Sequence, residues 1–269
     1  FIDNSLNASV IEDLKSYKNL KNFYISGCTI DESFMKGLNK LNVKSLSITK
    51  SQLPEAILEK SINALKDLEI LSINQCNLNS KLSITAPMLQ NIDLERNELK
   101  ELKVSGLQNL ESVKISQNKL QYFEISSESV ERIYAAKNQL KNFKLQTPKL
   151  VYLSLEYNDL TVVPDLSNTK LLSLQLSENP IENITLPKSL QFLELNYIKI
   201  SKNIKNAISQ STDLEYLSLI NAGIADQDNW VFNKLKKLTD LKLTKKSLSD
   251  KAKPWIKALT KRGVDVKVW

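Results

Sequence analysis

The 269-residue chain has no histidine, two cysteines and five glycines, and each shortage excludes a class of chemistry. Without histidine, neither a Ser/His/Asp nor a Cys/His catalytic set can form, and no imidazole can bind a metal. Two cysteines cannot complete a four-cysteine zinc site. The glycines lie too far apart to form a dinucleotide-binding or nucleoside-triphosphate-binding loop. We therefore expect no cofactor, no metal and no catalysis.

Long apolar runs are also absent. None approaches the ~18 residues of a membrane-spanning helix, so we expect no transmembrane segment. Hydrophobic residues nevertheless make up 42% of the chain, which is enough for a folded core. The sequence therefore predicts an ordered protein rather than a disordered one.

An eleven-residue pattern, LxxLxLxxNxL, recurs along the chain. Its clearest copies begin at residues 89, 110, 130, 150 and 171, as in LVYLSLEYNDL at 150–160. Six further copies, in which another residue replaces the asparagine, begin at residues 20, 43, 68, 190, 214 and 238. The chain thus resembles the leucine-rich repeat family over residues 20–248, because successive copies start at intervals near the ~20–29 residues typical of that family. Its short tandem repeats are similar to those of bacterial surface and secreted proteins.

Alternation within each copy predicts a strand, and repetition stacks the strands into a parallel sheet. We expect an α/β repeat fold: a curved solenoid of eleven repeats with the sheet on its concave side. Convex segments should be extended in the middle and helical at 54–65 and 201–211. We place a helical cap at 1–19, beginning with a Ser9/Glu12 capping box and ending near Tyr17, the solenoid at 20–248, and a helix-strand cap at 249–269.

The ninth position of each copy falls where the chain leaves the strand. An asparagine there can satisfy backbone groups of adjacent turns inside the core, so we interpret these asparagines as structural. Cys28 and Cys76 occupy the same position two turns apart, about 10 Å by strand spacing, which is too far for a disulfide. We expect two buried free thiols. The predicted structural ladder comprises Cys28, Cys76, Asn97, Asn118, Asn138, Asn158 and Asn179.

The net charge of +7 is concentrated at one end. Residues 234–269 contain eleven lysines and one arginine against three aspartates, which gives +9 and leaves −2 for residues 1–233. A solvated cap face explains this basicity, and electrostatic contact with a polyanion or an acidic membrane is the alternative. No motif supports specific nucleic-acid binding. The predicted basic patch comprises Lys245, Lys246, Lys251, Lys253, Lys257, Lys261 and Arg262.

Positions two, three, five, seven and eight of the motif are predicted to face the concave surface, where side chains have no packing role. Six of the eight tyrosines fall at such positions, and repeats seven to ten carry no lysine or arginine there. This predicts an acidic, aromatic patch of the kind that binds a partner. The predicted partner-binding residues are Arg132, Tyr134, Tyr152, Glu156, Tyr157, Glu178, Phe192, Glu194, Tyr197 and Tyr216.

These features favour a non-catalytic protein-interaction module. Its partner should be a protein or peptide with basic and apolar groups, attracted by charge complementarity and cation–π contacts. Carbohydrate binding by the tyrosines, or polyanion or membrane binding by the basic cap, is the alternative. We expect a monomer, located outside the cell or at its surface and engaged with a host protein.

Overall fold

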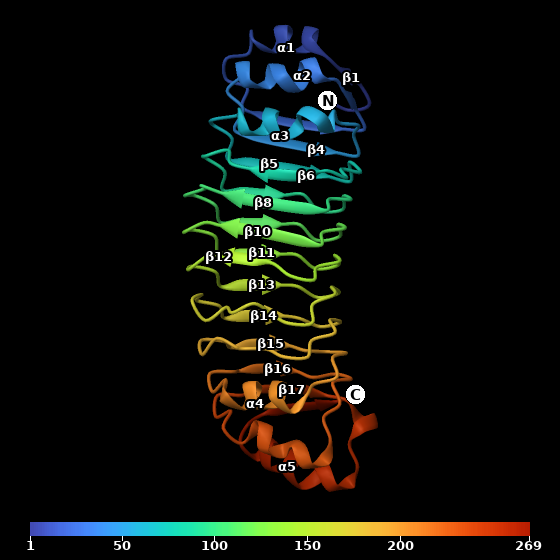
Figure 1. The fold of residues 1–269 in the computed structure, drawn as a ribbon, viewed down its shortest axis with the longest axis vertical. Coiled ribbons are helices and arrows are strands. Elements are labelled where there is room, and N and C mark those ends of the chain that lie inside the picture. The colour runs from blue at the N-terminus through green and yellow to red at the C-terminus, as the bar shows by residue number, and fades with distance from the viewer. The chain divides into compact units, whose positions relative to one another are not determined.

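The computed structural model describes all residues, 1–269, and its contacts divide the chain into two compact units. The N-terminal unit comprises Phe1–Gln139 and Phe143–Pro148, and the C-terminal unit comprises Leu140–Asn142 and Lys149–Trp269. Each of the eleven motif copies forms one strand of a parallel sheet within its unit, here called the motif sheet of that unit. The predicted leucine-rich-repeat type of fold is confirmed, and Figure 1 shows its stacked strands within each unit.

In the N-terminal unit, the motif strands pair in parallel and in register. Alternate residues such as Ile48 and Val113 are fully buried, so the leucine-type positions of each strand form the core. The strands of the N-terminal motif sheet are β2 (Asn22–Ser26), β4 (Ser45–Thr49), β5 (Ile70–Asn74), β7 (Asn91–Asp93), β9 (Ser112–Lys114) and β11 (Arg132–Tyr134).

A second parallel sheet in this unit is formed by the segments that follow the ladder position. Its strands, in spatial order, are β12 (Lys144–Gln146), β10 (Tyr122–Ser126), β8 (Glu101–Ser105) and β6 (Lys81–Ile84). One face is buried, where the rings of Phe123 and Phe143 stack with centroids 5.4 Å apart. The extended segments predicted for the middle repeats are therefore a true sheet in this unit.

Helices replace the second sheet in the first repeats, as predicted for 54–65. The N-terminal unit contains α1 (Ala8–Leu14), α2 (Glu32–Gly37), the 3-10 helix η1 (Leu38–Lys40), α3 (Glu55–Asn63) and a small pair of strands, β1 (Ser5–Leu6) and β3 (Thr29–Ile30).

The predicted start and end of the first helix are wrong. Asn7, not Ser9, is the N-cap of α1: its backbone is extended, and its side-chain oxygen accepts the Ser9 N–H at 3.0 Å. An N-cap side chain must reach the free N–H groups of the first helical turn, and Asn7 can do so because it lies directly before that turn. The helix ends at Leu14 rather than near Tyr17.

The C-terminal unit continues the same plan. Its motif sheet is entirely parallel and in register, and the last strand follows the cap helix. Its elements are β13 (Tyr152–Ser154), β14 (Ser173–Gln175), β15 (Phe192–Glu194), α4 (Lys202–Gln210), β16 (Tyr216–Ser218), η2 (Asp226–Phe232), β17 (Asp240–Leu243), η3 (Lys245–Ser247), η4 (Asp250–Ala252), α5 (Lys253–Lys261) and β18 (Asp265–Val268).

Second-sheet pairing in this unit is limited to one bridge, between Val162 and Asn183. Residues 181–186 belong to the convex segments predicted to be extended in the middle repeats, and they contribute only this contact. Pro164 and Pro187 flank the region, and because proline has no N–H it cannot donate to a sheet ladder.

The ladder asparagines lie between neighbouring turns. Asn118 donates from Nδ2 to the carbonyl oxygens of Leu94 (2.9 Å) and Ile115 (3.1 Å), and its Oδ1 accepts the Leu99 N–H at 3.1 Å. Asn179 repeats the arrangement in the C-terminal unit, where its Nδ2 donates to the Leu155 carbonyl oxygen at 2.9 Å. One side chain therefore satisfies both carbonyl and N–H groups, which a smaller or apolar side chain cannot do.

Where the asparagine is missing, other groups take over part of its role. Ser51 occupies the ladder position of the second repeat, and its hydroxyl accepts the Cys28 N–H at 3.0 Å. Cys28 and Cys76 are buried free thiols, as predicted, and burial raises the pKa of the Cys76 thiol. In the C-terminal unit, Asn196 accepts the Ile220 N–H at 2.9 Å from a position two residues before the ladder.

The residue immediately before the ladder position has a left-handed backbone in ten of the eleven repeats. Gly27 is the glycine among them, with φ of +66°, but lysine, glutamine, arginine, tyrosine and glutamate adopt the same conformation elsewhere. Such a conformation is unfavourable for residues with a Cβ, so the turn itself must impose it. Position eight of the motif is thus a turn residue and not part of the strand.

Candidate functional site

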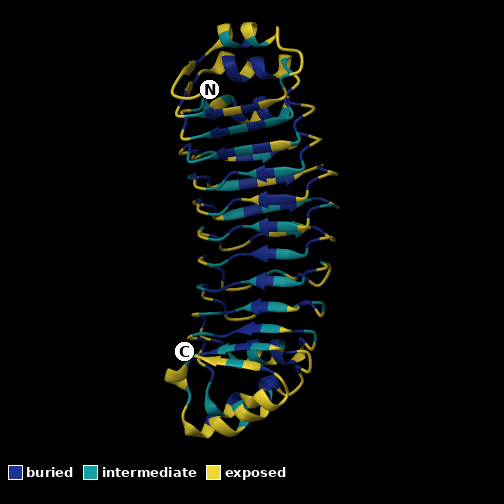
Figure 2. Ribbon diagram, turned by 180° about the vertical axis from the view of Figure 1, so that it is seen from behind, coloured by how far each residue is buried: buried dark blue, intermediate teal, exposed yellow.

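The strand register gathers aromatic side chains on the exposed face of the C-terminal motif sheet. At position three, Tyr152 is opposite Ser173, Ser173 is opposite Phe192, and Phe192 is opposite Tyr216. At position five, Gln175 is opposite Glu194. Figure 2 shows the partly exposed residues of these strands between buried ones. We call Tyr152, Ser173, Gln175, Phe192, Glu194 and Tyr216 the aromatic strip.

Two rings of the aromatic strip are stacked face to face. The centroids of Phe192 and Tyr216 are 4.1 Å apart, with an angle of 4° between the ring planes. Both side chains are half-buried, so each of the two rings keeps a face or an edge open to solvent. Neighbouring strands lie close enough for such cross-strand contact, which fixes both rings before anything binds.

Polar side chains tie the rings together across four strands. The Tyr152 hydroxyl donates to Gln175, Gln175 Nε2 donates to Glu194 Oε2 at 3.4 Å, and the Tyr216 hydroxyl donates to Glu194 Oε1 at 3.1 Å. The Glu194 carboxylate thus accepts from both sides. This network holds an acidic group between aromatic rings.

Lys242 on β17 borders the aromatic strip. Its Nζ lies 5.0 Å from the centroid of the Tyr216 ring. A hydrogen bond with Tyr216, together with the nearby Glu194 and Asp240 carboxylates, raises the pKa of Lys242. Repeats seven to ten indeed carry no cation at these positions, but a lysine from repeat eleven reaches them. The strip is therefore aromatic, with its acidity partly offset at the β17 end.

Four other predicted partner-binding residues of this unit lie beyond the strand ends. Tyr157, Glu178 and Tyr197 are left-handed turn residues, and Glu156 follows β13, where it accepts a hydrogen bond from Ser154. Tyr157 and Tyr197 are 52% and 55% exposed. They form a row along the turns, separate from the strand positions of the aromatic strip.

Arg132 and Tyr134 belong to β11 in the N-terminal unit. Arg132 contacts the carboxylates of Glu131 (3.2 Å) and Glu111 (3.9 Å), and Lys114 lies 5.9 Å from the Tyr134 ring centroid. Arginine, lysine and tyrosine thus alternate with glutamates on this face. This face therefore has mixed charge.

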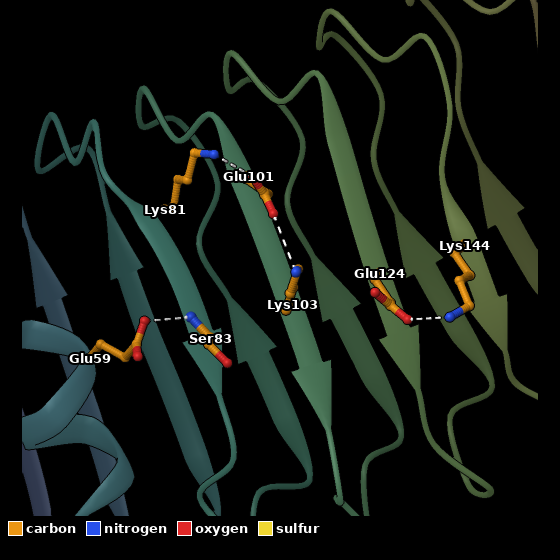
Figure 3. A network of polar contacts seen from close by, with 7 residues as sticks. All are labelled: Glu59, Lys81, Ser83, Glu101, Lys103, Glu124 and Lys144. Atoms are coloured by element: carbon orange, nitrogen blue, oxygen red, sulfur yellow. Dashed lines mark hydrogen bonds and ion pairs between the residues drawn. The ribbon is translucent and has the colours of Figure 1, made fainter.

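The exposed face of the second sheet carries a network of paired charges among polar side chains. Lys103 is opposite Glu124, and Glu124 is opposite Lys144. Figure 3 shows the resulting network: Lys81 to Glu101 at 2.7 Å, Lys103 to Glu101 at 3.7 Å and Lys144 to Glu124 at 2.7 Å. The hydrogen bond from Lys144 lowers the pKa of Glu124, and that from Lys81 lowers the pKa of Glu101.

The edge of this sheet at β6 is covered by α3. Glu59 accepts the Ser83 N–H at 2.8 Å, as Figure 3 shows, and Asn63 accepts the Thr85 N–H at 2.9 Å. Glu55, one turn earlier, accepts the N–H groups of Asn79 and Ser80. Residues four apart lie on one face of a helix, so this face substitutes for a neighbouring strand.

The basic residues of the C-terminal cap are all exposed, but some are engaged. Lys253 pairs with Asp250 at 2.8 Å, and the Arg262 guanidinium donates to the Leu235 carbonyl. Lys257 and Lys261 form no ion pair and follow Lys253 at four-residue intervals along α5. Of the predicted basic patch, Lys253, Lys257 and Lys261 thus form a stripe on α5 whose first member is paired. The other predicted lysines lie outside this helix: Lys245 and Lys246 in η3 and Lys251 in η4.

Sequence reasoning missed Ser173, Gln175 and Lys242. Serine and glutamine at motif positions three and five attract no notice singly, and their role comes from lying between Tyr152 and Phe192 and between Tyr152 and Glu194. The strand register is the signal that finds them. Over residues 1–269, no group of three or more acidic or cysteine side chains could hold a metal ion, and no helix is long and apolar enough to cross a membrane.

Comparison with known proteins adds relatives of one kind. No protein-family model matches the chain. Lumican of the mouse, Mus musculus, is 30% identical over 145 residues, which are 54% of this chain and 38% of lumican. Lumican of the rabbit, Oryctolagus cuniculus, is also 30% identical over 145 residues, which are 54% of this chain and 68% of the rabbit sequence. The matched part spans well under half of the mouse protein.

Solved structures with a similar fold are more distant in sequence. The functional domain of InlJ from Listeria monocytogenes, described as including a cysteine ladder, has a TM-score of 0.60 and 17% identity over 86% of this chain and 60% of its own. A leucine-rich repeat protein of Leptospira interrogans has a TM-score of 0.58 and 20% identity over 98% of this chain and 75% of its own. At these identities the likeness concerns the fold alone.

Proposed function

Because this chain belongs to the leucine-rich repeat family, we propose that it is a protein-interaction module that binds a peptide or protein segment on the aromatic strip. The observation that carries the proposal is the stacked pair Phe192 and Tyr216, which is half-buried and so keeps part of both rings exposed to solvent. Rigid aromatic side chains lose little conformational entropy on binding and are typical of interface hot spots.

The surface of the aromatic strip also contains a gap between rings. Ser173 lies between Tyr152 and Phe192 in the same column, so a short side chain separates two rings. An apolar side chain of a partner can enter this gap and contact ring faces on both sides. Shape of this kind gives a partner a defined position along the sheet.

The charges around the aromatic strip also restrict which partner segment can bind. Glu194 lies between the hydroxyl of Tyr216 and the amide of Gln175, where a lysine or arginine of the partner can reach both a carboxylate and ring faces. Lys242 occupies the β17 side of Tyr216 and repels a cation there. We therefore propose a partner segment with one basic and one apolar side chain, bound toward β14 and β15.

We take the module to be non-catalytic and to act outside the cell or at its surface. The absence of histidine supports the first point. Glu178 and Glu194 do not form a pair suited to glycoside hydrolysis, because one lies in a turn and the other on a strand of an open face. The resemblance of the short repeats to those of bacterial surface and secreted proteins supports the second point.

Selection of peptides from a randomised display library tests the proposal. The wild type should enrich peptides that combine lysine or arginine with an aromatic or aliphatic residue. The variant Phe192→Ala/Tyr216→Ala should lose at least tenfold in affinity for them. The matched control, Lys103→Ala/Glu124→Ala on the second sheet, should bind as the wild type does. Equal binding by the aromatic double variant contradicts the proposal.

A further inference from the structure

A hollow of about 540 Å³ lies in the N-terminal unit, far along the chain from the aromatic strip. It is lined by three segments that each lead into a motif strand: residues from 14–23, 39–43 and 64–67. The volume falls within the range of ligand pockets in proteins. Neither the aromatic strip nor the predicted basic patch contributes to it.

The inner wall of the hollow is apolar. Phe23, Val43 and Leu65 line it and are buried, while Leu20 and Leu41 line it and are half-buried. Apolar surface at the bottom of a water-filled hollow favours an occupant with an aliphatic or aromatic group.

The rim is cationic. Lys18, Lys40 and Lys66 line the hollow, are exposed, and form no ion pair or side-chain hydrogen bond. Lys15 also lines it but pairs with Glu12 at 2.6 Å. Asp67 is the one acidic residue of the lining. Three unpaired ammonium groups therefore surround an apolar wall.

The repeat geometry explains this grouping. Lys18, Lys40 and Lys66 each lie two or three residues before the first leucine-type position of their repeat, and three successive repeats bring them to the same edge. The corresponding residues of the next three repeats, 86–88, 107–109 and 127–129, contain no lysine or arginine. Lysines return to this position only from Lys149 onward, in the repeats that begin at residues 150, 171, 190 and 238, so within the N-terminal motif sheet the three cations are restricted to the repeats that form the hollow.

We infer that the hollow binds an acidic peptide segment carrying at least one apolar side chain. Neighbouring repeats are about 5 Å apart, so the three lysines span a length that two or three acidic residues of an extended peptide can match. Acidic side chains reach the rim while the apolar side chain contacts Phe23 and Leu41. A flat membrane surface does not enter the hollow, and a nucleic acid offers no apolar side chain for its wall.

Fluorescence anisotropy with labelled hexapeptides tests the inference. The sequence EELFEE should bind, whereas EEGSEE, which keeps the charges without the apolar pair, and KKLFKK, which reverses them, should each bind at least tenfold more weakly. The variant Lys18→Glu/Lys40→Glu/Lys66→Glu should lose at least tenfold in affinity for EELFEE. All three lysines are exposed, so the substitutions should leave the fold intact by circular dichroism.

A matched variant separates the hollow from net charge. Lys251→Glu/Lys257→Glu/Lys261→Glu changes the charge equally on the C-terminal cap and should alter EELFEE binding less than twofold. Equal loss in both triple variants, or equal binding of EELFEE and EEGSEE, overturns the inference. The result is independent of the aromatic strip, because Phe192→Ala/Tyr216→Ala should bind EELFEE as the wild type does.

Discussion

Two exposed sheet faces of this protein are built by the same register rule and differ in what they carry. On the second sheet of the N-terminal unit, Lys103, Glu124 and Lys144 follow one another across adjacent strands. On the motif sheet of the C-terminal unit, the corresponding in-register neighbours are Phe192 and Tyr216. One face pairs charges and the other stacks rings.

This contrast shows how a repeat protein can present one face that attracts no partner and another that can bind one. Each charge of the second sheet is satisfied by its neighbour, and solvent-exposed pairs contribute little stability and leave little to offer a partner. Stacked rings retain exposed apolar area that only a partner can cover. The stability of both faces comes from the core and the asparagine ladder, which leaves the exposed positions available for function.

The largest expected effect concerns the ladder. Asn118→Ala leaves the buried Leu99 N–H without its acceptor and removes one of two side-chain donors from the carbonyls of Leu94 and Ile115, which keep Asn97 and Asn138. The loss of three buried hydrogen bonds should cost about 3 kcal/mol. Lys103→Ala/Glu124→Ala should cost less than about 1 kcal/mol. Urea unfolding measures both. A larger loss from the surface pair than from Asn118→Ala shows that exposed charges, not the ladder, hold the sheets.

The next effect concerns the charge of the aromatic strip. Glu194→Gln keeps the size and an acceptor oxygen but removes the negative charge, so affinity for a basic peptide selected as above should fall about tenfold, or about 1.4 kcal/mol. Glu124→Gln on the second sheet is the control and should change nothing. An unaffected Glu194→Gln variant in an affinity titration shows that the rings act without the carboxylate.

A smaller effect is expected at the edge of the second sheet. Glu59→Ala removes the acceptor of the Ser83 N–H and should cost about 1 kcal/mol. Hydrogen exchange at Ser83 should accelerate, while exchange in β10 stays slow. If β10 exchanges faster as well, α3 holds the whole sheet and not only its edge.

The smallest effect is the pH dependence of the charged face. The hydrogen bond from Lys144 lowers the folded-state pKa of Glu124 below its usual 4.5. Its stabilisation is therefore present above the unfolded-state pKa and lost as pH falls through the folded-state pKa. The difference in unfolding free energy between wild type and Lys144→Met should be small at pH 7 and shrink steadily as the pH falls below 4.5. A difference that does not change with pH in this acid range has another origin.

The repeats, the ladder asparagines and the helices near 54–65 and 201–211 follow from the sequence, because spacing alone determines them. The cap at Asn7 does not, because Ser9 offers an equally good oxygen two residues later. The left-handed turns are hidden as well: a glycine such as Gly27 hints at them, but Arg96 and Tyr157 adopt the same backbone under constraint from the repeat.

The predicted binding residues also divide into those that motif spacing places correctly and those that it does not. Phe192, Glu194 and Tyr216 could be found from motif positions three and five, which truly lie on strands. Tyr157 and Tyr197 were placed with them because position eight looks like a continuation of the strand. Lys242 escaped notice because its effect on Tyr216 depends on pairing between repeats ten and eleven, which the motif of one repeat does not show.

Site-specific photocrosslinking tests the central claim most directly. A benzophenone amino acid at Ser173, between Tyr152 and Phe192, is compared with the same group at Ser105 on the exposed face of β8. With a selected basic–apolar peptide, irradiation should give a covalent adduct by mass spectrometry at position 173 and none at position 105. An adduct at 105 with none at 173 contradicts the assignment of the aromatic strip as the binding face.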